Sequence, residues 1–400
     1  MMSAASPLSL ICALLLCLPL AVLFTVNSPT AINSVQNSDH PFIFPLQSLY
    51  MPKTHRKITL FQIPSPPPSP PPEEDDLLFP LASRVDPTPS PTRKLAFMFL
   101  TNSPLPFAPL WELFFKNIPP DLYNVYIHAD PTREYDPPFS GVFSHRVIPS
   151  KPTQRFTPSL TAAARRLLAH ALLHDSSNSM FALLSPSCIP LHSFNFTYKT
   201  LIHSKKSFIE VLKNEIGAYD RWAARGPDAM LPVVKLEDLR IGSQFWVLTR
   251  RHARTVVRDK KVWSKFDLPC VRWDTCYPEE NYFPTLLSMW DHRGLIPATL
   301  THVDWNGSFD GHPRTYDKSD VTPNLIRSLR MSRLRYGDGD GAGGIEMRIR
   351  TRTKTSGRRS SSSSSAAKHY RRHTFLFARK FSADTLQPLM NISSDVIFKD

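Results

Sequence analysis

Trp273-Asp-Thr-Cys-Tyr-Pro-Glu-Glu-Asn-Tyr-Phe-Pro-Thr-Leu-Leu287 places two adjacent acidic residues, Glu279 and Glu280, directly after a proline and among aromatic side chains. Pro278 fixes its own φ and lacks an N–H, so it suits the first turn of a helix, where the helix dipole favours negative charge. Two interpretations follow. Both carboxylates only stabilise the start of a helix, or one of them lines a cleft and takes a proton from a substrate hydroxyl.

Short apolar runs and helical patterns alternate upstream of this stretch. We expect buried strands at 95–100, 123–130 and 180–184, a helix-like segment at 111–116 and an amphipathic helix at 159–174. Strands that alternate with helices predict an α/β fold with a parallel sheet. Ligands of such sheets gather at the carboxyl ends of the strands.

Two predicted strands end in charged residues. Asp130 ends the strand at 123–130, where the alternative to a ligand-binding role is a turn residue before Pro131. The run 374–381 places Arg379 and Lys380 after a short apolar strand. Two fixed cations there are suited to clamping a diphosphate, although a solvated basic edge has the same pattern.

The amphipathic helix at 159–174 shows an uneven distribution of charge. Ala163, Leu167 and Ala171 share one side, which we expect to face the core, and Arg165 and Arg166 lie on another. Further along, 241–248 is expected to be a strand and 250–260 a basic helix.

The N-terminal region differs from the rest of the chain in composition. Residues 7–26 are almost wholly apolar, and no charged side chain precedes Asp39. About twenty such residues can span a bilayer, so we expect an uncleaved signal anchor after a short cytosolic tail at 1–6, with a cleavable signal peptide as the alternative. Residues 27–93, rich in proline, are expected to be a stem, and 94–400 a lumenal domain.

The formal charge of +14 over 400 residues is concentrated in one segment. Between Glu346 and Arg372 there are nine basic residues and one acidic residue, whereas the remainder is only mildly basic. A basic binding face for nucleic acid on the folded domain is therefore not indicated. We predict that 337–373, with its glycine, arginine and serine runs, is a disordered insert.

Five cysteines form no disulfide framework, because Cys12 and Cys17 fall in the apolar run. Cys270 and Cys276 are close enough in sequence to pair across a short loop in an oxidising compartment. The cysteines and histidines lack zinc spacing, and Asp338-Gly-Asp340 follows no strand, so no metal site is predicted.

Seven short motifs occur together in a fixed order. They are Tyr126-Ile-His-Ala-Asp130, Leu183-Leu-Ser-Pro-Ser-Cys-Ile-Pro-Leu191, Gly242-Ser-Gln-Phe-Trp246, Cys276-Tyr-Pro-Glu-Glu-Asn281 with Pro284-Thr-Leu-Leu287, Asp304-Trp305, His312-Pro313 and Leu376-Phe-Ala-Arg-Lys-Phe381. Their number and order resemble the core-2/I-branching β-1,6-N-acetylglucosaminyltransferase family, in particular its plant branch. The resemblance covers about residues 94–397, with a gap over 335–373.

This resemblance implies a GT-A-like nucleotide-sugar-binding fold behind the anchor and stem, in a single-pass type II protein of the Golgi membrane. It implies an inverting enzyme that uses a UDP-sugar donor, a glycan or glycoprotein acceptor and no divalent metal. Glu280 would be the general base, Lys380 and Arg379 would neutralise the leaving diphosphate, and Asp130 would lie near the uridine. N-acetylglucosamine is the expected sugar, with glucuronic acid as an alternative among plant relatives.

Mechanistic chemistry agrees with these roles, because an inverting transfer needs one base for the acceptor hydroxyl and cations for the departing diphosphate. A second arginine of the family's diphosphate site falls in the region that departs from the pattern. Two other hypotheses remain: a catalytically silent lumenal protein that binds glycan or UDP, and a nucleic-acid binder that uses the arginine-rich run, against which the apolar N-terminal segment argues.

Overall fold

The computed structural model describes residues 75–306, 312–339 and 373–400. The predicted tail at 1–6, the anchor at 7–26, the stem up to residue 74 and residues 340–372 of the predicted insert lie outside these ranges. Among the described residues, no helix is both long and apolar enough to cross a bilayer. All described residues belong to one compact unit, 68–400.

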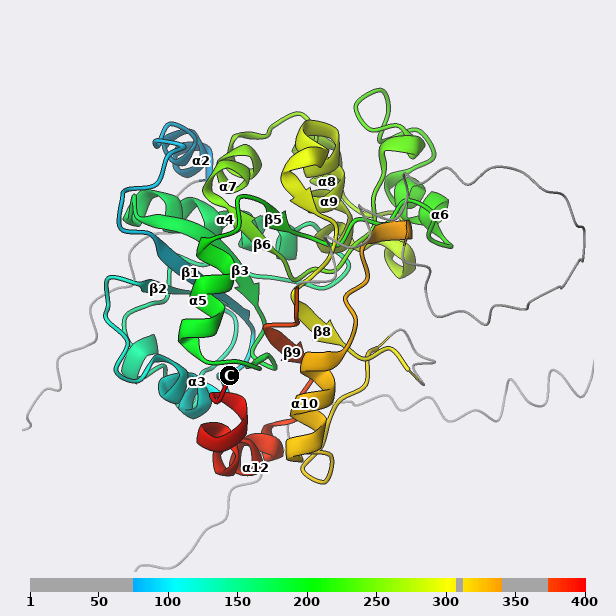
Figure 1. The fold of residues 1–400 in the computed structure, drawn as a ribbon. Coiled ribbons are helices and arrows are strands. Elements are labelled where there is room, and N and C mark those ends of the chain that lie inside the picture. Colours follow the sequence, from blue (N-terminus) through cyan, green and yellow to red (C-terminus); the bar gives the residue numbers. More distant parts are fainter. Residues whose placement is uncertain (1–74, 307–311, 340–372) are drawn as a thin grey trace, which may run out of the picture. The chain divides into compact units, whose positions relative to one another are not determined.

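Two sheets lie at the centre of this unit (Figure 1). The larger has six strands in the order β2-β1-β3-β6-β5-β7, and the smaller has three in the order β4-β9-β8. The strands are β1 (Lys94–Thr101), β2 (Tyr123–Ala129), β3 (Asn178–Leu184), β4 (Ile189–Pro190), β5 (Ser207–Phe208), β6 (Val247–Thr249), β7 (Leu295–Ile296), β8 (Thr301–Val303) and β9 (Phe377–Arg379).

Helices surround both sheets. The α-helices are α2 (Asp75–Ser83), α3 (Ala108–Phe115), α4 (Ser159–His174), α5 (Phe194–Ile202), α6 (Ala218–Trp222), α7 (Arg250–Arg258), α8 (Trp263–Phe266), α9 (Pro278–Asp291), α10 (Pro323–Met331) and α12 (Leu386–Asn391). Short 3₁₀ turns include η3 (Leu236–Asp238) and η6 (Gly337–Gly339), and a π-helical turn covers Ser393–Ile397.

The large sheet separates two hydrophobic cores. Successive residues of β1 alternate between them: Phe97 and Phe99 pack into the core of α3, α5 and β9, whereas Ala96 and Met98 pack into the core of α2, α4, α7 and α9. Every residue of β1 after Lys94 is buried. A continuous apolar run is what a strand covered on both faces requires.

The predicted parallel α/β core is confirmed. β1 pairs in parallel with β2 and with β3, and α4 has the predicted bounds. The strand predicted at 241–248 is wrong over most of its length. Only Val247–Thr249 is a strand, antiparallel to β3, because Ile241 instead bridges to Leu212 and the backbone then turns past Glu210.

The prediction that Arg165 and Arg166 lie away from the core is also wrong, because both are buried. The Arg165 guanidinium lies between the rings of Phe79 and Trp263, at 4.5 and 4.3 Å, and donates to the carbonyl of Asp259. The Arg166 guanidinium pairs with Asp75. α2 and α7 cover this side of α4, which the sequence of α4 alone does not reveal.

The folded part begins earlier than the predicted boundary at Lys94. α2 packs on α4 and α7 with Leu78 and Ala82 fully buried, and Lys151 contacts Asp75 at 2.9 Å. The sequence of α2, Asp-Asp-Leu-Leu-Phe-Pro-Leu-Ala-Ser, is short and contains Pro80. Its composition therefore resembles that of the proline-rich stem, which is why the sequence did not indicate a helix of the domain. Residues 75–93 are thus part of the domain.

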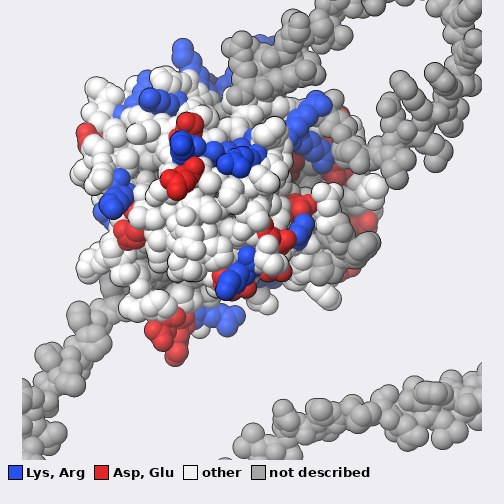
Figure 2. Space-filling view, turned by 60° about the horizontal axis from the view of Figure 1, so that its bottom comes forward, with Lys and Arg blue, Asp and Glu red and all other residues white. Residues whose placement is uncertain are grey.

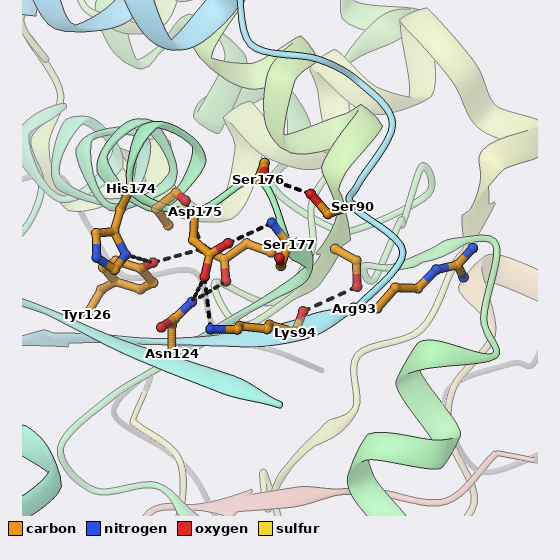
Figure 3. Close-up of polar contacts among 12 residues, drawn as sticks. Ser90, Arg93, Lys94, Asn124, Tyr126, His174, Asp175, Ser176 and Ser177 are labelled. Atoms are coloured by element: carbon orange, nitrogen blue, oxygen red, sulfur yellow. Dashed lines mark hydrogen bonds and ion pairs between the residues drawn. The ribbon is translucent and has the colours of Figure 1, made fainter. Parts of the chain in front are cut away.

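The segment that leads into β1 is fixed by polar contacts at the amino ends of the parallel strands (Figure 3). Lys94 pairs with Asp175 at 3.0 Å, and the Asn124 amide donates to the same carboxylate at 2.9 Å. The Ser90 hydroxyl bonds to Ser176 at 2.7 Å. This network lies at the opposite end of the strands from Asp130, so it supports the sheet and leaves the carboxyl edge open.

On the face shown in Figure 2, lysines and arginines lie beside acidic residues, with wide uncharged areas between them. This face shows no broad basic surface of the kind that binds a phosphate backbone.

We expect Leu78→Ala to lower the free energy of unfolding of the full chain by about 2–5 kcal/mol, because it leaves a cavity where α2 meets α4. Urea unfolding measures the change. Leu77→Ala is the matched control, since Leu77 is 63 % exposed on the same helix. Equal effects of the two substitutions would show that α2 does not pack on the domain.

Candidate active site

The first turn of α9 holds both acidic residues, as the sequence predicts. Pro278 is the first residue of the helix, and Tyr282, Phe283 and Leu287 bury the following turns in the core. This packing fixes the axis of the helix. Glu279 and Glu280 therefore project from a rigid element into two different surroundings.

Glu279 is 6 % exposed, and its Oε2 atom is buried without a hydrogen-bond partner. Burial raises the pKa of this carboxyl to about 7, and the nearby charge of Glu280 acts in the same direction. A side chain that solvent hardly reaches is poorly placed to contact a substrate hydroxyl.

The Glu280 side chain is 31 % exposed, and its Oε2 accepts a hydrogen bond from Arg221 at 2.6 Å. The Arg221 guanidinium also lies over the ring of Tyr277 at 4.6 Å, so the arginine is held from two sides. Among the described residues Oε1 of Glu280 accepts no hydrogen bond. Glu280 is thus an oriented carboxylate with one oxygen open to a ligand.

Gly242 positions this turn. Its N–H donates to the carbonyl of Glu280 at 2.9 Å, and a Cβ at this position would lie 2.1 Å from the carbonyl oxygen of Glu210. Only a glycine allows the two backbones to approach this closely. Burial raises the pKa of the Glu210 carboxyl to about 7, with a further contribution from Glu280. Three carboxylates therefore meet around the start of α9.

The predicted cations lie at the carboxyl end of β9, where Arg379 is the last residue of the strand and Lys380 follows it. The Arg379 guanidinium packs over the ring of Phe245 at 4.6 Å, and its Nε is buried without a hydrogen-bond partner. Burial lowers the pKa of Arg379, whereas the charges of Cys188 and Glu280 raise it and that of Arg155 lowers it. Arg379 is therefore close enough to Glu280 for the two charges to interact.

Lys380 follows Arg379 and is half-buried, and its carbonyl accepts from the N–H of Tyr316 at 2.8 Å. β9 runs parallel to β8 and antiparallel to β4, which joins the loop after β3. The small sheet thus brings residues 379–380 from the C-terminal part of the chain to the carboxyl side of the β1–β3 core.

Asp130 lies directly after β2 and is only 1 % exposed. One carboxylate oxygen accepts from the N–H and hydroxyl of Thr132, at 2.9 and 2.7 Å, and the other accepts from the same groups of Thr153 at the same distances. Burial acts to raise its pKa, but these four bonds outweigh burial and lower the pKa to about 2. Asp130 therefore holds two loops together, and its carboxylate is already occupied.

The predicted pairing of Cys270 with Cys276 is confirmed by a disulfide with a Cα–Cα distance of 6.2 Å. It closes the loop just before α9. In the described ranges, no group of three His, Cys, Asp or Glu side chains is arranged to hold a metal ion.

Comparison with known proteins agrees with this geometry. Residues 95–330 match the family model described as Core-2/I-Branching enzyme. This match includes β1–β3, Gly242 and both acids of α9. The chain belongs to the Core-2/I-branching enzyme family.

A plant relative supports the same assignment. The chain is 32 % identical to "Glycosyltransferase BC10" of Oryza sativa subsp. japonica over 277 residues, which cover 61 % of this chain and 67 % of the rice protein. The resemblance to the plant branch is thereby confirmed, and the mixed α/β sheet fits a GT-A-like glycosyltransferase fold.

The sequence did not identify several residues of this Core-2/I-branching site. Arg221 lies on the short helix α6, whereas Arg155 and Glu210 lie in loops, and each reaches the start of α9 only through tertiary packing. The only available signal was the sequence Gly242-Ser-Gln-Phe-Trp246, which marks a motif without revealing what its glycine contacts.

The raised pKa of Glu279 predicts a dependence of stability on pH. The favourable contribution of the neutral carboxyl is complete below the unfolded-state pKa of about 4.5 and is lost as pH rises through about 7. We expect Glu279→Gln to change the melting temperature little at pH 5 and to raise it by several degrees at pH 8.

Thermal unfolding at both pH values measures this effect. Glu237→Gln, which alters a carboxylate on η3 that is 67 % exposed, is the control. A Glu279→Gln variant that follows the wild type at both pH values would contradict the burial of an ionisable group at this position.

Asp130 gives stability the opposite dependence on pH. Because the pKa of its carboxyl is lowered, the ionised carboxylate stabilises the fold above pH 3.8, and this contribution is lost as pH falls toward 2. Asp130→Asn replaces one acceptor by an amide donor, so we expect it to cost about 1–3 kcal/mol at pH 7 and less at pH 3. Urea unfolding at both values tests this. A loss that is independent of pH would show that the carboxylate charge is not involved.

Proposed function

We propose that this Core-2/I-branching enzyme is an inverting transferase that moves a sugar from a UDP donor to a hydroxyl of a glycan, with Glu280 as the general base. The observation that carries the proposal is the half-exposed Glu280 carboxylate, held by Arg221 at 2.6 Å and within the electrostatic range of Arg379.

In the proposed reaction the acceptor hydroxyl gives its proton to Glu280 as its oxygen attacks the anomeric carbon. The bond from that carbon to the UDP oxygen breaks on the opposite side, and UDP departs with the bonding electrons. The configuration at the anomeric carbon is inverted. Arg221 fixes the orientation of the Glu280 carboxylate, so the oxygen that has no hydrogen-bond partner among the described residues is placed to accept the proton.

The departing diphosphate gains negative charge, which cations must stabilise. Arg379 suits this role because it is half-buried and has an N–H without a partner, a group that a phosphate oxygen would satisfy. Lys380 is its neighbour in the same motif. We propose that these two residues do the work of a divalent metal, so that transfer needs none.

The position of Asp130 supports an indirect role toward the nucleotide. Its four hydrogen bonds fix the loops that begin after β2 and precede α4. These loops border the carboxyl edge of the sheet, where nucleotides bind in α/β folds. Backbone groups of these loops would then contact the uridine.

N-acetylglucosamine is the donor sugar that we propose first, and glucuronic acid is the alternative. We further propose that the chain is a single-pass type II protein of the Golgi membrane, anchored by residues 7–26. Exposed asparagines of the sequons at Asn195 and Asn391 are compatible with a lumenal domain.

Substitution at Glu280 tests the base. We expect Glu280→Gln in the full chain to lower kcat by about 10²-fold or more, because the amide cannot accept the proton. The measurement is release of UDP and formation of the glycoside, with UDP-N-acetylglucosamine and UDP-glucuronic acid as donors. Glu237→Gln is the matched control.

Each assay is repeated with EDTA. Activity that persists under chelation supports the cationic clamp, and Lys380→Ala should then reduce it. Transfer that is lost on chelation would contradict a metal-free mechanism. UDP binding without turnover of either donor by the wild type would identify a catalytically silent relative.

A further inference from the structure

A second feature of the surface lies next to the carboxylates of α9. It is an open pocket of about 600 Å³, formed by the loop 154–158, the start of α4 and the segment 267–273. Phe156 and Trp273 supply aromatic surface, and Arg155, Ser159 and Asp267 supply polar groups. We call it the aromatic pocket.

The backbone of the aromatic pocket is built in an unusual way. Phe156 has a φ of 65°, a conformation that bulky residues rarely adopt. The turn is fixed from inside, since the Gln154 N–H donates to the Ser159 hydroxyl at 2.7 Å and the Thr157 hydroxyl donates to the Gln154 carbonyl at 2.7 Å. Such local strain is characteristic of functional segments.

This turn directs the Phe156 ring at two other aromatic residues. Its centroid lies 5.7 Å from that of Trp273 and 5.5 Å from that of Tyr277, both in edge-to-face geometry. Trp273 nevertheless remains 67 % exposed. The disulfide between Cys270 and Cys276 closes the loop that carries it. The result is a fixed indole with a face open to solvent.

A short chain of contacts joins the aromatic pocket to the proposed base. Phe156 packs on Tyr277, the Tyr277 ring lies under the guanidinium of Arg221, and Arg221 bonds to Glu280. The pocket is not lined by Asp130, Arg379 or Lys380. The aromatic pocket is therefore linked to Glu280 through Tyr277 and Arg221, and its lining shares no residue with the proposed diphosphate clamp.

We propose that the aromatic pocket binds the pyranose ring of the acceptor glycan that adjoins the reacting sugar, stacked on Trp273. One face of a pyranose presents C–H groups, which suit an exposed indole, while its hydroxyls need polar partners at the rim. The pocket offers both. This inference rests on the proposed function, since it takes the reacting hydroxyl to lie at Glu280.

The volume of the aromatic pocket supports an extended acceptor, because about 600 Å³ lies within the range of sites that bind small ligands. A disaccharide would place one ring at Glu280 and the second on Trp273. The enzyme would then discriminate against monosaccharide acceptors, which reach only the first position.

The test compares Trp273→Ala with wild type in the full chain, using N-acetyllactosamine, chitobiose and β-1,3-galactobiose, each beside its constituent monosaccharides. We expect the variant to raise KM for the disaccharide acceptors about tenfold, with the KM of the donor changed less than twofold. Trp273→Phe, which keeps an aromatic face, should recover most of the loss.

Trp290→Ala is the control, because Trp290 is also exposed but lies in the last turn of α9 and contacts Arg251. Calorimetric titration of each disaccharide without donor supplies a second measurement. Its affinity should fall in Trp273→Ala and stay unchanged in Trp290→Ala.

The outcomes separate this inference from the proposed function. Turnover with equal acceptor KM in wild type and Trp273→Ala overturns the inference and leaves the proposed function intact. Binding of a disaccharide that depends on Trp273, in a chain that turns over no donor, supports the pocket and overturns the transferase proposal. A lack of saturable binding by any saccharide of the panel overturns the inference.

Discussion

The hydrogen bond from the Gly242 N–H to the Glu280 carbonyl ties the acidic turn of α9 to the backbone around Glu210. α9 is held along its length by Tyr282 and Phe283 in the core, and Pro278 and Glu279 of its first turn are buried as well. The contact with Gly242 completes that support. The backbone contact between Gly242 and Glu280 therefore fixes the position of Glu280, and Glu280 in turn fixes that of Arg221.

Two neighbouring carboxylates acquire different properties from this arrangement. Glu279 points into the protein, where burial raises the pKa of the carboxyl and so favours its neutral form. Glu280 points outward and is paired with an arginine. A difference of one residue on a helix turns the side chain by about 100°, which is enough to move it from one environment to the other. The fold assigns different chemistry to identical side chains in this way.

The sequence predicted those parts of the fold that local patterns determine. β1 and α4 were predictable because a continuous apolar run and a 3.6-residue period are strong signals that do not depend on distant residues. Arg165 and Arg166 were misplaced because α2, which covers them, belongs to a segment with the composition of a stem. For the site, motifs located Glu280 and Arg379. The partners Arg221 and Arg155 could not be found, because a five-residue helix and an irregular loop give no periodic signal and their contacts are set by tertiary structure.

The described residues on either side of 340–372 contact one another and the same part of the domain. Asp338 accepts hydrogen bonds from the N–H groups of Lys213 and Asn214, and the His373 ring packs on Phe208 and bonds to the Tyr336 hydroxyl at 3.3 Å. Contacts with residues 208–214 therefore fix the chain on both sides of residues 340–372.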